Sequence, residues 1–399
     1  MNISQRISVG IWTLLIPISL SATAGLPMLN AIDPIFSSAN AVGERSVAGH
    51  FDVPGTGAVH ALAWSPNGRL LLVTSHQGSF ANIYDMTNGQ ISPAMTISDH
   101  GVTTKGAVIY DDGSFIVPVS GVSSTRSAVA VTLKRFNRRG NLIEQIFPSN
   151  VDEGYKDLNI LGVHAALDSR SLSIIGVDTT AKTRGLPLSK QWPAALISLM
   201  PTRVTAISSP FPGDQAPIVR DLALSANGKW AAALDNRGNV RIWSKDRNNF
   251  VEDINLCQPR SVTCAKSRIS SNGKYVLFSG DETARSPLNG TNVVSGQHGV
   301  PQVWSIERRG VIATLHDASR RSATSLELAS WKLDDSEIVL TDTGTLSVWT
   351  VKDGTTHLSF NREVPRRSDG LVAYPITAVA YSMEGVLAVS AGNHVVIYR

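Results

Sequence analysis

The sequence is poor in the residues and motifs that mark the common classes of enzyme. Of its 399 residues only two are cysteine, 6% are aromatic and 17% carry a charge. It contains no C-x-x-C pair, no G-x-S-x-G nucleophile elbow, no H-E-x-x-H metal helix and no phosphate-binding glycine loop. We therefore predict no catalytic residue, no metal ligand and no cofactor.

Long apolar runs are scarce as well, and the one candidate lies at the amino terminus. A run over residues 7–22 follows a positively charged start and is too short to span a bilayer comfortably. It ends in Ala-Thr-Ala at positions 22–24, the A-x-A pattern typical of a signal peptidase site. The pattern predicts a signal peptide over residues 1–24, a linker over residues 25–44 and a periplasmic or secreted protein. A retained membrane anchor is the alternative.

The two cysteines, Cys257 and Cys264, are seven residues apart with Pro259 between them. In an exported protein such a pair forms a disulfide, and closing a loop of about eight residues contributes roughly 2.5 kcal/mol in the chain-entropy model. A metal site would need further ligands, and no histidine lies near either cysteine in the sequence. We therefore predict a local disulfide between Cys257 and Cys264.

Charge of one sign is not concentrated in any block. The chain has 36 Lys and Arg against 32 Asp and Glu, a formal net charge of +4 and a pI near 9.1. Its arginine pairs are scattered, at positions 138–139, 308–309, 320–321 and 366–367. We interpret these pairs as solvated loop charge and expect no nucleic-acid partner.

What the sequence does contain is a repeat. Four segments share one plan: a strand, a polar turn, a second strand, a glycine turn and a third strand that ends in or beside an aromatic residue. These copies cover residues 59–85, 219–244, 326–349 and 376–398, and looser copies are centred on residues 110–113, 167–170 and 271–273. Each Asn-Gly or Asp-Gly turn predicts a two-residue hairpin, because glycine adopts a positive φ freely and asparagine tolerates one.

The spacing of the copies and the ends of the chain predict how the strands assemble. Gly68 and Gly385 lie 317 residues apart in six steps, so one repeat takes about 53 residues, enough for a four-stranded blade. The last copy stops at Arg399 after its third strand, whereas residues 45–53 form an orphan strand before the first copy. The sequence thus predicts an all-β, seven-bladed β-propeller over residues 45–399, with four-stranded antiparallel blades and the amino-terminal strand completing the last blade.

Two copies carry a resemblance to a known family. Segments 65–68 (Ser-Pro-Asn-Gly) with 83–85 (Ile-Tyr-Asp), and 225–228 (Ser-Ala-Asn-Gly) with 240–243 (Val-Arg-Ile-Trp), resemble WD40 repeats. The resemblance extends over nearly all of the chain that follows the signal segment. The chain is most similar to a divergent bacterial branch of WD40-like, YVTN-type propellers. It implies a rigid platform whose loops hold protein partners.

Long links indicate which loops would do so. In this topology the links over residues 120–127, 178–191 and 280–300 emerge on one face. Ordering the roughly twenty residues of the longest link costs conformational entropy. We therefore favour a recognition role for this link over the alternative, a tolerated surface insertion. Seven charged or ionisable residues in these links are candidate partner-binding residues: Lys182, Arg184, Lys190, Asp281, Glu282, Arg285 and His298.

We therefore predict an exported, non-enzymatic protein-interaction scaffold. It would be a subunit or assembly factor of a larger cell-envelope complex, and it would associate with the membrane only through its protein partners. The alternative is a metal-dependent propeller hydrolase or lactonase, in which carboxylates from different blades converge on the central channel. Histidines such as His60 and His164 fall mostly in strands or blade links, and we interpret them as structural.

Overall fold

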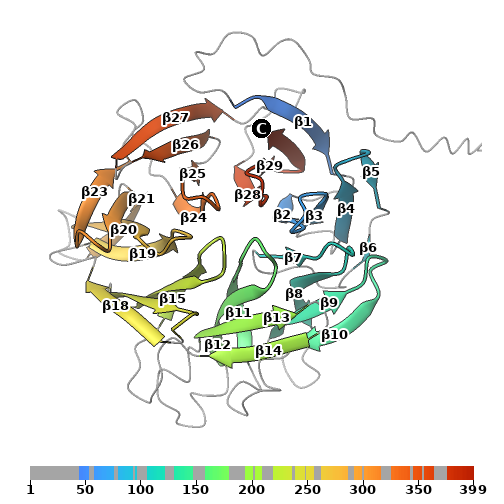
Figure 1. Ribbon diagram of the computed structural model, residues 1–399, viewed down its shortest axis with the longest axis horizontal. Helices are drawn as coiled ribbons and strands as arrows, with labels where there is room; N and C mark the ends of the chain where they lie inside the picture. The colour runs from blue at the N-terminus through green and yellow to red at the C-terminus, as the bar shows by residue number, and fades with distance from the viewer. Residues whose placement is uncertain are drawn as a thin grey trace, which may run out of the picture.

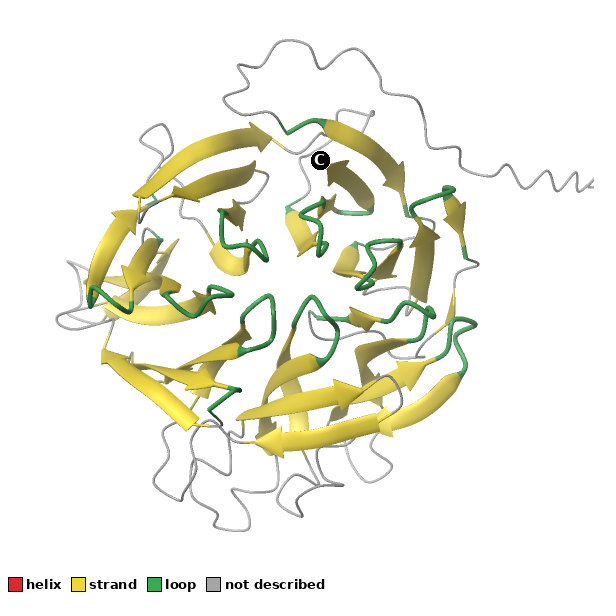
Figure 2. Cartoon of the chain, viewed as in Figure 1, coloured by secondary structure: helices red, strands yellow, loops and turns green. Residues whose placement is uncertain are grey.

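The computed structural model describes residues 45–53, 58–75, 80–92, 95–96, 106–121, 130–146, 158–178, 194–200, 203–208, 219–235, 239–247, 249–255, 262–285, 292–298, 301–315, 325–341, 345–352, 355–363 and 375–399. In these ranges the chain forms strands and turns (Figure 2). No helix found in them has the length and apolarity needed to span a membrane. The predicted signal peptide and linker lie outside these ranges, as do Lys182, Arg184, Lys190 and Cys257. What the sequence predicts for these residues therefore stays a prediction.

The described strands form seven antiparallel sheets that follow one another around a central axis (Figure 1). Six sheets are continuous in the sequence, and the seventh combines the first strand of the chain with the last three. The predicted all-β propeller, with mostly four-stranded antiparallel blades, is confirmed.

We number the sheets one to seven in chain order. The first four comprise β2 (Val59–Trp64), β3 (Leu70–Ser75), β4 (Phe80–Asp85), β5 (Gln90–Ile91) and β6 (Met95–Thr96); β7 (Val108–Ile109), β8 (Phe115–Gly121), β9 (Ala130–Phe136) and β10 (Leu142–Ile146); β11 (Leu158–Ala165), β12 (Ser171–Asp178), β13 (Ala194–Met200) and β14 (Arg203–Ser208); and β15 (Val219–Leu224), β16 (Trp230–Asp235), β17 (Asn239–Ser244) and β18 (Asn249–Asn255). The others comprise β19 (Val262–Ile269), β20 (Tyr275–Arg285), β21 (Asn292–His298), β22 (Gln302–Ser305) and β23 (Gly310–Thr314); β24 (Ser325–Trp331), β25 (Glu337–Thr341), β26 (Thr345–Lys352) and β27 (Thr355–Glu363); and β28 (Ile376–Tyr381), β29 (Leu387–Ala391) and β30 (His394–Tyr398) with β1 (Val47–Asp52).

Inner strands are apolar on both faces because each sheet packs between two neighbours. In β3 every side chain is buried. Leu70 and Leu72 belong to the apolar cluster shared with the second sheet, while Leu71 and Val73 belong to the cluster shared with the seventh. The described residues form seven such clusters, each centred on one pair of neighbouring sheets. The core is therefore a ring of interfaces rather than one central mass.

The ring closes through the amino-terminal strand, as the sequence predicted. β1 pairs antiparallel with β30, and the ladder continues into hydrogen bonds between Ser46 and Arg399 in both directions, each 3.0 Å long. Beyond the ladder, the Arg45 side chain forms an ion pair with Glu337 on β25 and lies 5.6 Å from the centre of the Tyr381 ring. The closing strand is thus fixed to the sixth sheet as well as to the seventh.

The turn after the first strand of each sheet differs from the two-residue hairpin that the sequence predicted. In the first sheet the loop is longer: the Ser65 amide donates to the carbonyl of Leu70 (2.8 Å), and the Gly68 amide donates to the carbonyl of Ser65 (2.8 Å). The positive φ (67°) falls on Gly68, while Asn67 instead accepts the Arg69 amide at its side-chain oxygen (2.9 Å). Asparagine is selected here for side-chain hydrogen bonding, not for a left-handed backbone.

A second correction concerns the link over residues 280–300, which was predicted to be a loop. β20 continues to Arg285 and pairs with β21, so that most of this link is an antiparallel hairpin. Apolar and β-branched residues such as Val293 and Val294 favour this strand. The other two long links fall largely on residues 122–129 and 179–193, outside the described ranges.

We predict that stability depends on residues 45–53, which contain β1 and the contacts of Arg45 and Ser46, and not on residues 1–44. A chain that starts at residue 54 loses β1 and the Arg45 contacts, which leaves β30 with an open edge. We expect this chain to be less stable by several kcal/mol, because each ladder hydrogen bond contributes about 1 kcal/mol net, and to scatter light on heating because open edges associate. A chain that starts at residue 45 is the control, and thermal unfolding should place it well above the shorter chain. Equal melting temperatures would contradict the closure mechanism.

Candidate functional site in the central channel

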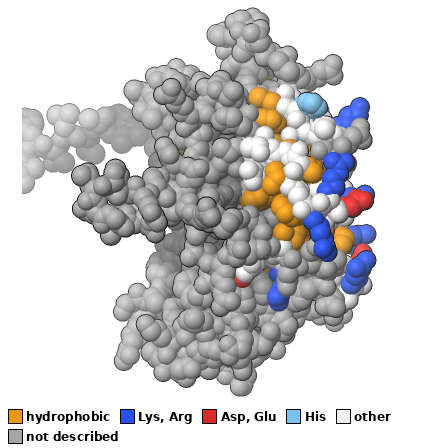
Figure 3. Space-filling model, turned by 90° about the vertical axis from the view of Figure 1, so that its left-hand side faces the viewer, with side chains coloured by type: hydrophobic (Ala, Val, Ile, Leu, Met, Phe, Trp, Pro, Cys, Tyr) orange, Lys and Arg blue, Asp and Glu red, His pale blue; other side chains and the backbone are white. Residues whose placement is uncertain are grey.

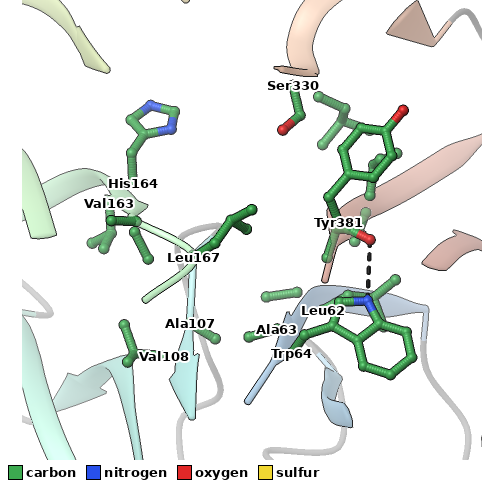
Figure 4. Close-up of a pocket in the computed structure, with 18 of the residues that line it drawn as sticks. Leu62, Ala63, Trp64, Ala107, Val108, Val163, His164, Leu167, Ser330 and Tyr381 are labelled. Carbon is green, nitrogen blue, oxygen red and sulfur yellow. Dashed lines mark hydrogen bonds between the residues drawn. The ribbon is translucent and has the colours of Figure 1, made fainter. Parts of the chain in front are cut away.

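The first strands of the sheets surround a cavity of about 180 Å³ at the centre of the ring (Figure 4). We call these strands the channel strands; β2, β7, β11, β19, β24 and β28 contribute its lining. Most lining residues are small or apolar, and the polar lining side chains include His60, His164, Arg268, Ser330 and Tyr381. Figure 4 shows the His164 ring projecting into this space from one side, with Tyr381 across from it.

A shared backbone feature aligns the seven channel strands. In every sheet the turn after this strand contains a residue with positive φ: Gly68, Gly113, Ser169, Gly228, Gly273, Asp335 and Gly385. Five residues earlier, four sheets have Ala63, Val108, Ala223 and Ala380, whereas the other three have His164, Arg268 and Ser330. Seven residues earlier, two sheets have the charged residues Asp221 and Lys266, and the others have Ala61, Gly106, Gly162, Leu328 and Ala378.

This alignment makes the channel asymmetric. The ionisable side chains at these positions come from β11, β15 and β19, which are consecutive around the ring. Small residues hold the same positions on β2, β7 and β28, on the other side of the axis. Small side chains leave the space that forms the cavity, so one half of the channel is charged and the other half is not.

Asp221 is the centre of the charged half. Its side chain is fully buried on β15, and Oδ2 accepts hydrogen bonds from the Ser267 amide (2.9 Å) and from Nη1 of Arg268 (3.0 Å). The Arg268 guanidinium also donates to the carbonyls of Ser267 (2.6 Å) and Ala329 (3.1 Å). These contacts connect the fourth, fifth and sixth sheets through one arginine.

The second carboxylate oxygen of Asp221 has looser neighbours. Oδ1 lies 3.5 Å from Nε2 of His164 and 3.7 Å from Nζ of Lys266. Burial on its own would raise the pKa of Asp221, but the charge of Arg268, the contact with His164 and the charge of Lys266 outweigh it and hold the pKa well below its usual range. Asp221 is therefore a permanent anion.

His164 responds in the opposite sense. Its burial and the charge of Arg268 lower its pKa below the usual 6.5, and the nearby Asp221 only partly offsets them. The imidazole is neutral at neutral pH, so the cluster of His164, Asp221, Lys266 and Arg268 carries one negative and two positive formal charges. Such a site suits a rigid ionic crosslink with a residual positive charge, not a general base, because the carboxylate is held ionised by two cations.

The described residues contain no group of three or more His, Cys, Asp or Glu side chains arranged to hold a metal ion. In the channel cluster, the Asp221 carboxylate forms ion pairs with Lys266 and Arg268 instead. His164, which the sequence marked as structural, is part of this cluster. His60 also lines the cavity.

The structure brings together four of the residues predicted to bind partners, away from the channel. Asp281, Glu282 and Arg285 lie on β20 and His298 lies on β21, where the α-carbons of Asp281 and His298 are register partners. Cys264 lies on β19, next to Gly280 in register, whereas its predicted partner Cys257 is outside the described residues. The disulfide therefore stays a prediction.

Sequence reasoning missed Asp221, Lys266 and Arg268. A signal was present: Asp221 and Lys266 are charged residues inside the first strand of a repeat, at a position where the other five copies have Ala, Gly or Leu, and Arg268 lies two residues after Lys266. Aligning the copies on their turns would have placed Asp221 and Lys266 at one position. Asp221 and its two cationic neighbours belong to different sheets, however, and residues that meet in this way have no fixed spacing in the chain.

Comparison with known families supports the fold. The WD domain, G-beta repeat, matches residues 44–85, which span β1 to β4. The matched unit therefore begins in the seventh sheet and ends in the first, across the point where the ring closes. No curated protein matches the chain. The ring of antiparallel sheets defines a β-propeller, and the matched segment is similar to a WD40 repeat.

We predict that Asp221→Asn destabilises the protein by about 3–5 kcal/mol, because it leaves the buried Arg268 charge without its anion. The double variant Asp221→Leu/Arg268→Met removes both charges and should recover much of that loss. Chemical denaturation of the three proteins measures both effects. A single variant as stable as the parent would show that the ionic crosslink contributes little.

The His164 pKa predicts a pH dependence with a defined sign. Because the folded-state pKa is lowered, the unfolded chain takes up this proton first as the pH falls below about 6.5. Stability that is fully present above that pH is lost as the pH falls toward the folded-state pKa. The melting temperature of the parent should therefore fall between pH 7 and pH 5 more steeply than that of His164→Gln, and an unchanged slope in the variant would refute the assignment. Titration of the imidazole by NMR gives the pKa directly.

Proposed function

We propose that the protein is an exported, non-enzymatic scaffold and a subunit or assembly factor of a larger cell-envelope complex. It would bind protein partners through one face of the ring, opposite the face that carries the turns between the first and second strands of each sheet. WD40 propellers typically act as protein-interaction scaffolds, and this chain has the closed ring and a WD40 repeat. The loops of the proposed binding face come from the links between second and third strands.

One observation carries the proposal: the β20–β21 hairpin extends the fifth sheet beyond the strands that build the ring. β20 pairs with β22 only from Tyr275 to Phe278, and the rest of its length pairs with β19 and β21. Four of the seven residues predicted from sequence to bind partners belong to this extension, and the other three lie outside the described residues. In the part of the chain that the structure describes, β21 pairs with β20 alone.

A strand with one unpaired edge supports a specific mode of recognition. Its backbone amides and carbonyls are available to an extended partner segment, which would add a strand to the hairpin. Asp281 and Glu282 belong to β20, the strand with which β21 pairs, and this acidic pair favours a basic partner through complementarity.

The experiment compares two pairs of charge reversals in cells that produce the tagged full chain. Asp281→Lys/Glu282→Lys changes the hairpin, and Asp246→Lys/Glu307→Lys makes the same charge change in exposed turns on the opposite face. After mild solubilisation and cross-linking, we expect the hairpin variant to lose at least tenfold of the co-isolated partner, because like charges at an interface repel and unpaired charges must be desolvated. The control should retain it.

A variant in which residues 281–298 are replaced by a short Gly-rich turn tests the hairpin as a whole. It should melt close to the parent temperature, because the pairing of β20 with β22 is kept, and it should recover no partner. Isolation of the parent as a monomer alone, or equal recovery with all variants, would count against the proposal.

A further inference from the structure

A hollow of about 490 Å³ on the second sheet is unrelated to the channel and to the β20–β21 hairpin. It lies between the turn that follows β7 and the turn that joins β9 to β10. Its lining includes Ser114, Arg135, Asn137, Arg138, Arg139 and Ile143. Three arginines therefore border one depression.

Positive charge predominates in this hollow. Arg138 and Arg139 are exposed, whereas Arg135 is 1% exposed, with Nη1 lying 3.1 Å from Glu144 and the guanidinium 5.7 Å from the centre of the Tyr110 ring. The carboxylate in the lining is Asp112, whose Oδ1 accepts hydrogen bonds from the amide (2.8 Å) and hydroxyl (2.7 Å) of Ser114. Arg135 and Glu144 neutralise each other. The remaining charges are those of Arg138, Arg139 and Asp112, and Asp112 already accepts hydrogen bonds from Ser114.

The turn that carries the two arginines is held in place. The side-chain oxygen of Asn137 accepts the amides of Arg139 (2.9 Å) and Asn141 (3.0 Å), and Gly140 has a φ of 82°. A Cβ at Gly140 would meet the Cβ of Met95 at 2.8 Å, so the turn packs closely on the first sheet. The fixed backbone of this turn holds the two arginines next to each other at the hollow, and their planar guanidinium groups suit the oxygens of a phosphate.

Exposed apolar side chains follow these arginines after Gly140 and Asn141. Leu142 is 53% exposed and Ile143 is 56% exposed, and Val311 (46%) is the other large hydrophobic residue of the described chain with comparable exposure. Val311 follows the same sequence, Arg-Arg-Gly, in the turn of the fifth sheet. Both turns join the third and fourth strands of their sheets and so lie on one face. Figure 3 views the edge of the ring on the left of Figure 1, where Lys and Arg side chains, with Asp or Glu among them, gather along one side. Basic residues beside exposed apolar ones are typical of surfaces that bind anionic lipid.

We propose that the hollow of the second sheet binds the phosphate of an anionic phospholipid headgroup. Arg138 and Arg139 contact the phosphate, and Leu142 with Ile143 enters the boundary between headgroups and acyl chains. This direct contact departs from the expectation that the protein meets the membrane only through partners.

Co-sedimentation with vesicles tests the proposal, using chains from residue 25 onward so that the apolar amino terminus does not itself bind lipid. The parent should bind phosphatidylglycerol vesicles and not phosphatidylcholine vesicles, and more weakly as salt is raised. Arg138→Ala/Arg139→Ala should weaken binding about 30-fold, since each cation near an anionic surface contributes roughly fivefold. Lys245→Ala/Arg247→Ala removes two positive charges from the same face of the fourth sheet and should weaken binding less than threefold.

Two further arms separate the lipid from other anions. Leu142→Ser/Ile143→Ser should weaken vesicle binding. Leu142→Ser alone, which keeps the lining residue Ile143, should leave the weak binding of glycerol 1-phosphate, measured by calorimetry, unchanged. Equal loss of vesicle binding in Arg138→Ala/Arg139→Ala and in Lys245→Ala/Arg247→Ala would show a diffuse basic face and overturn the site. Binding of glycerol 1-phosphate or poly-glutamate without binding of phosphatidylglycerol vesicles would overturn the lipid, and so would full vesicle binding by Leu142→Ser/Ile143→Ser.

Discussion

Val47 and Tyr398 lie at opposite ends of the described chain, and the pairing of their strands is what makes the sheets a ring. Each sheet buries its two faces against neighbours, so a ring without this contact would have two terminal sheets with one face in water. The cluster between the seventh and first sheets contains Val53, Trp64 and Ile397, and it exists only because the ends meet. Closure therefore stabilises an interface as well as completing a ladder.

Closure also determines the channel. Seven sheets around an axis bring their first strands together, and bulky side chains there would fill the centre. This chain has small residues on one side and ion pairs on the other, so that the cavity and the Asp221 cluster arise from the same alignment of strands. The cluster joins three consecutive sheets by directional contacts, whereas the apolar clusters join sheets in pairs without a preferred direction. A buried ionic group of this kind is suited to fixing the relative register of sheets, even where its net contribution to stability is small.

The regular part of the fold could be predicted from the sequence because it depends on local chemistry. The strands of the first copy were expected at residues 59–64, 70–75 and 81–85, and the structure has β2, β3 and β4 at Val59–Trp64, Leu70–Ser75 and Phe80–Asp85. The looser copy centred on residues 167–170 was harder to detect because Ser169 occupies the left-handed position that glycine holds in most other copies. The length of β20 depends on its pairing with β21, and the ion pair of Asp221 with Arg268 depends on two different sheets. Neither feature is marked by a fixed residue spacing in the sequence.

The two faces of the ring differ in how their connections are built. Turns between first and second strands are short, and adjacent ones are hydrogen-bonded to each other: the Asn67 amide donates to Asp111 (3.0 Å), the Asn227 side chain to the carbonyl of Ser271 (2.6 Å) and the Asn272 amide to Asp335 (2.7 Å). These bonds cross from sheet to sheet, so a change in one such turn would strain its neighbours. The links on the other face join strands whose positions the ring already fixes, and a hairpin such as β20–β21 can therefore grow there at little cost to the core. Variation in loop length is therefore expected on that face, while the short turns of the other face are constrained by one another.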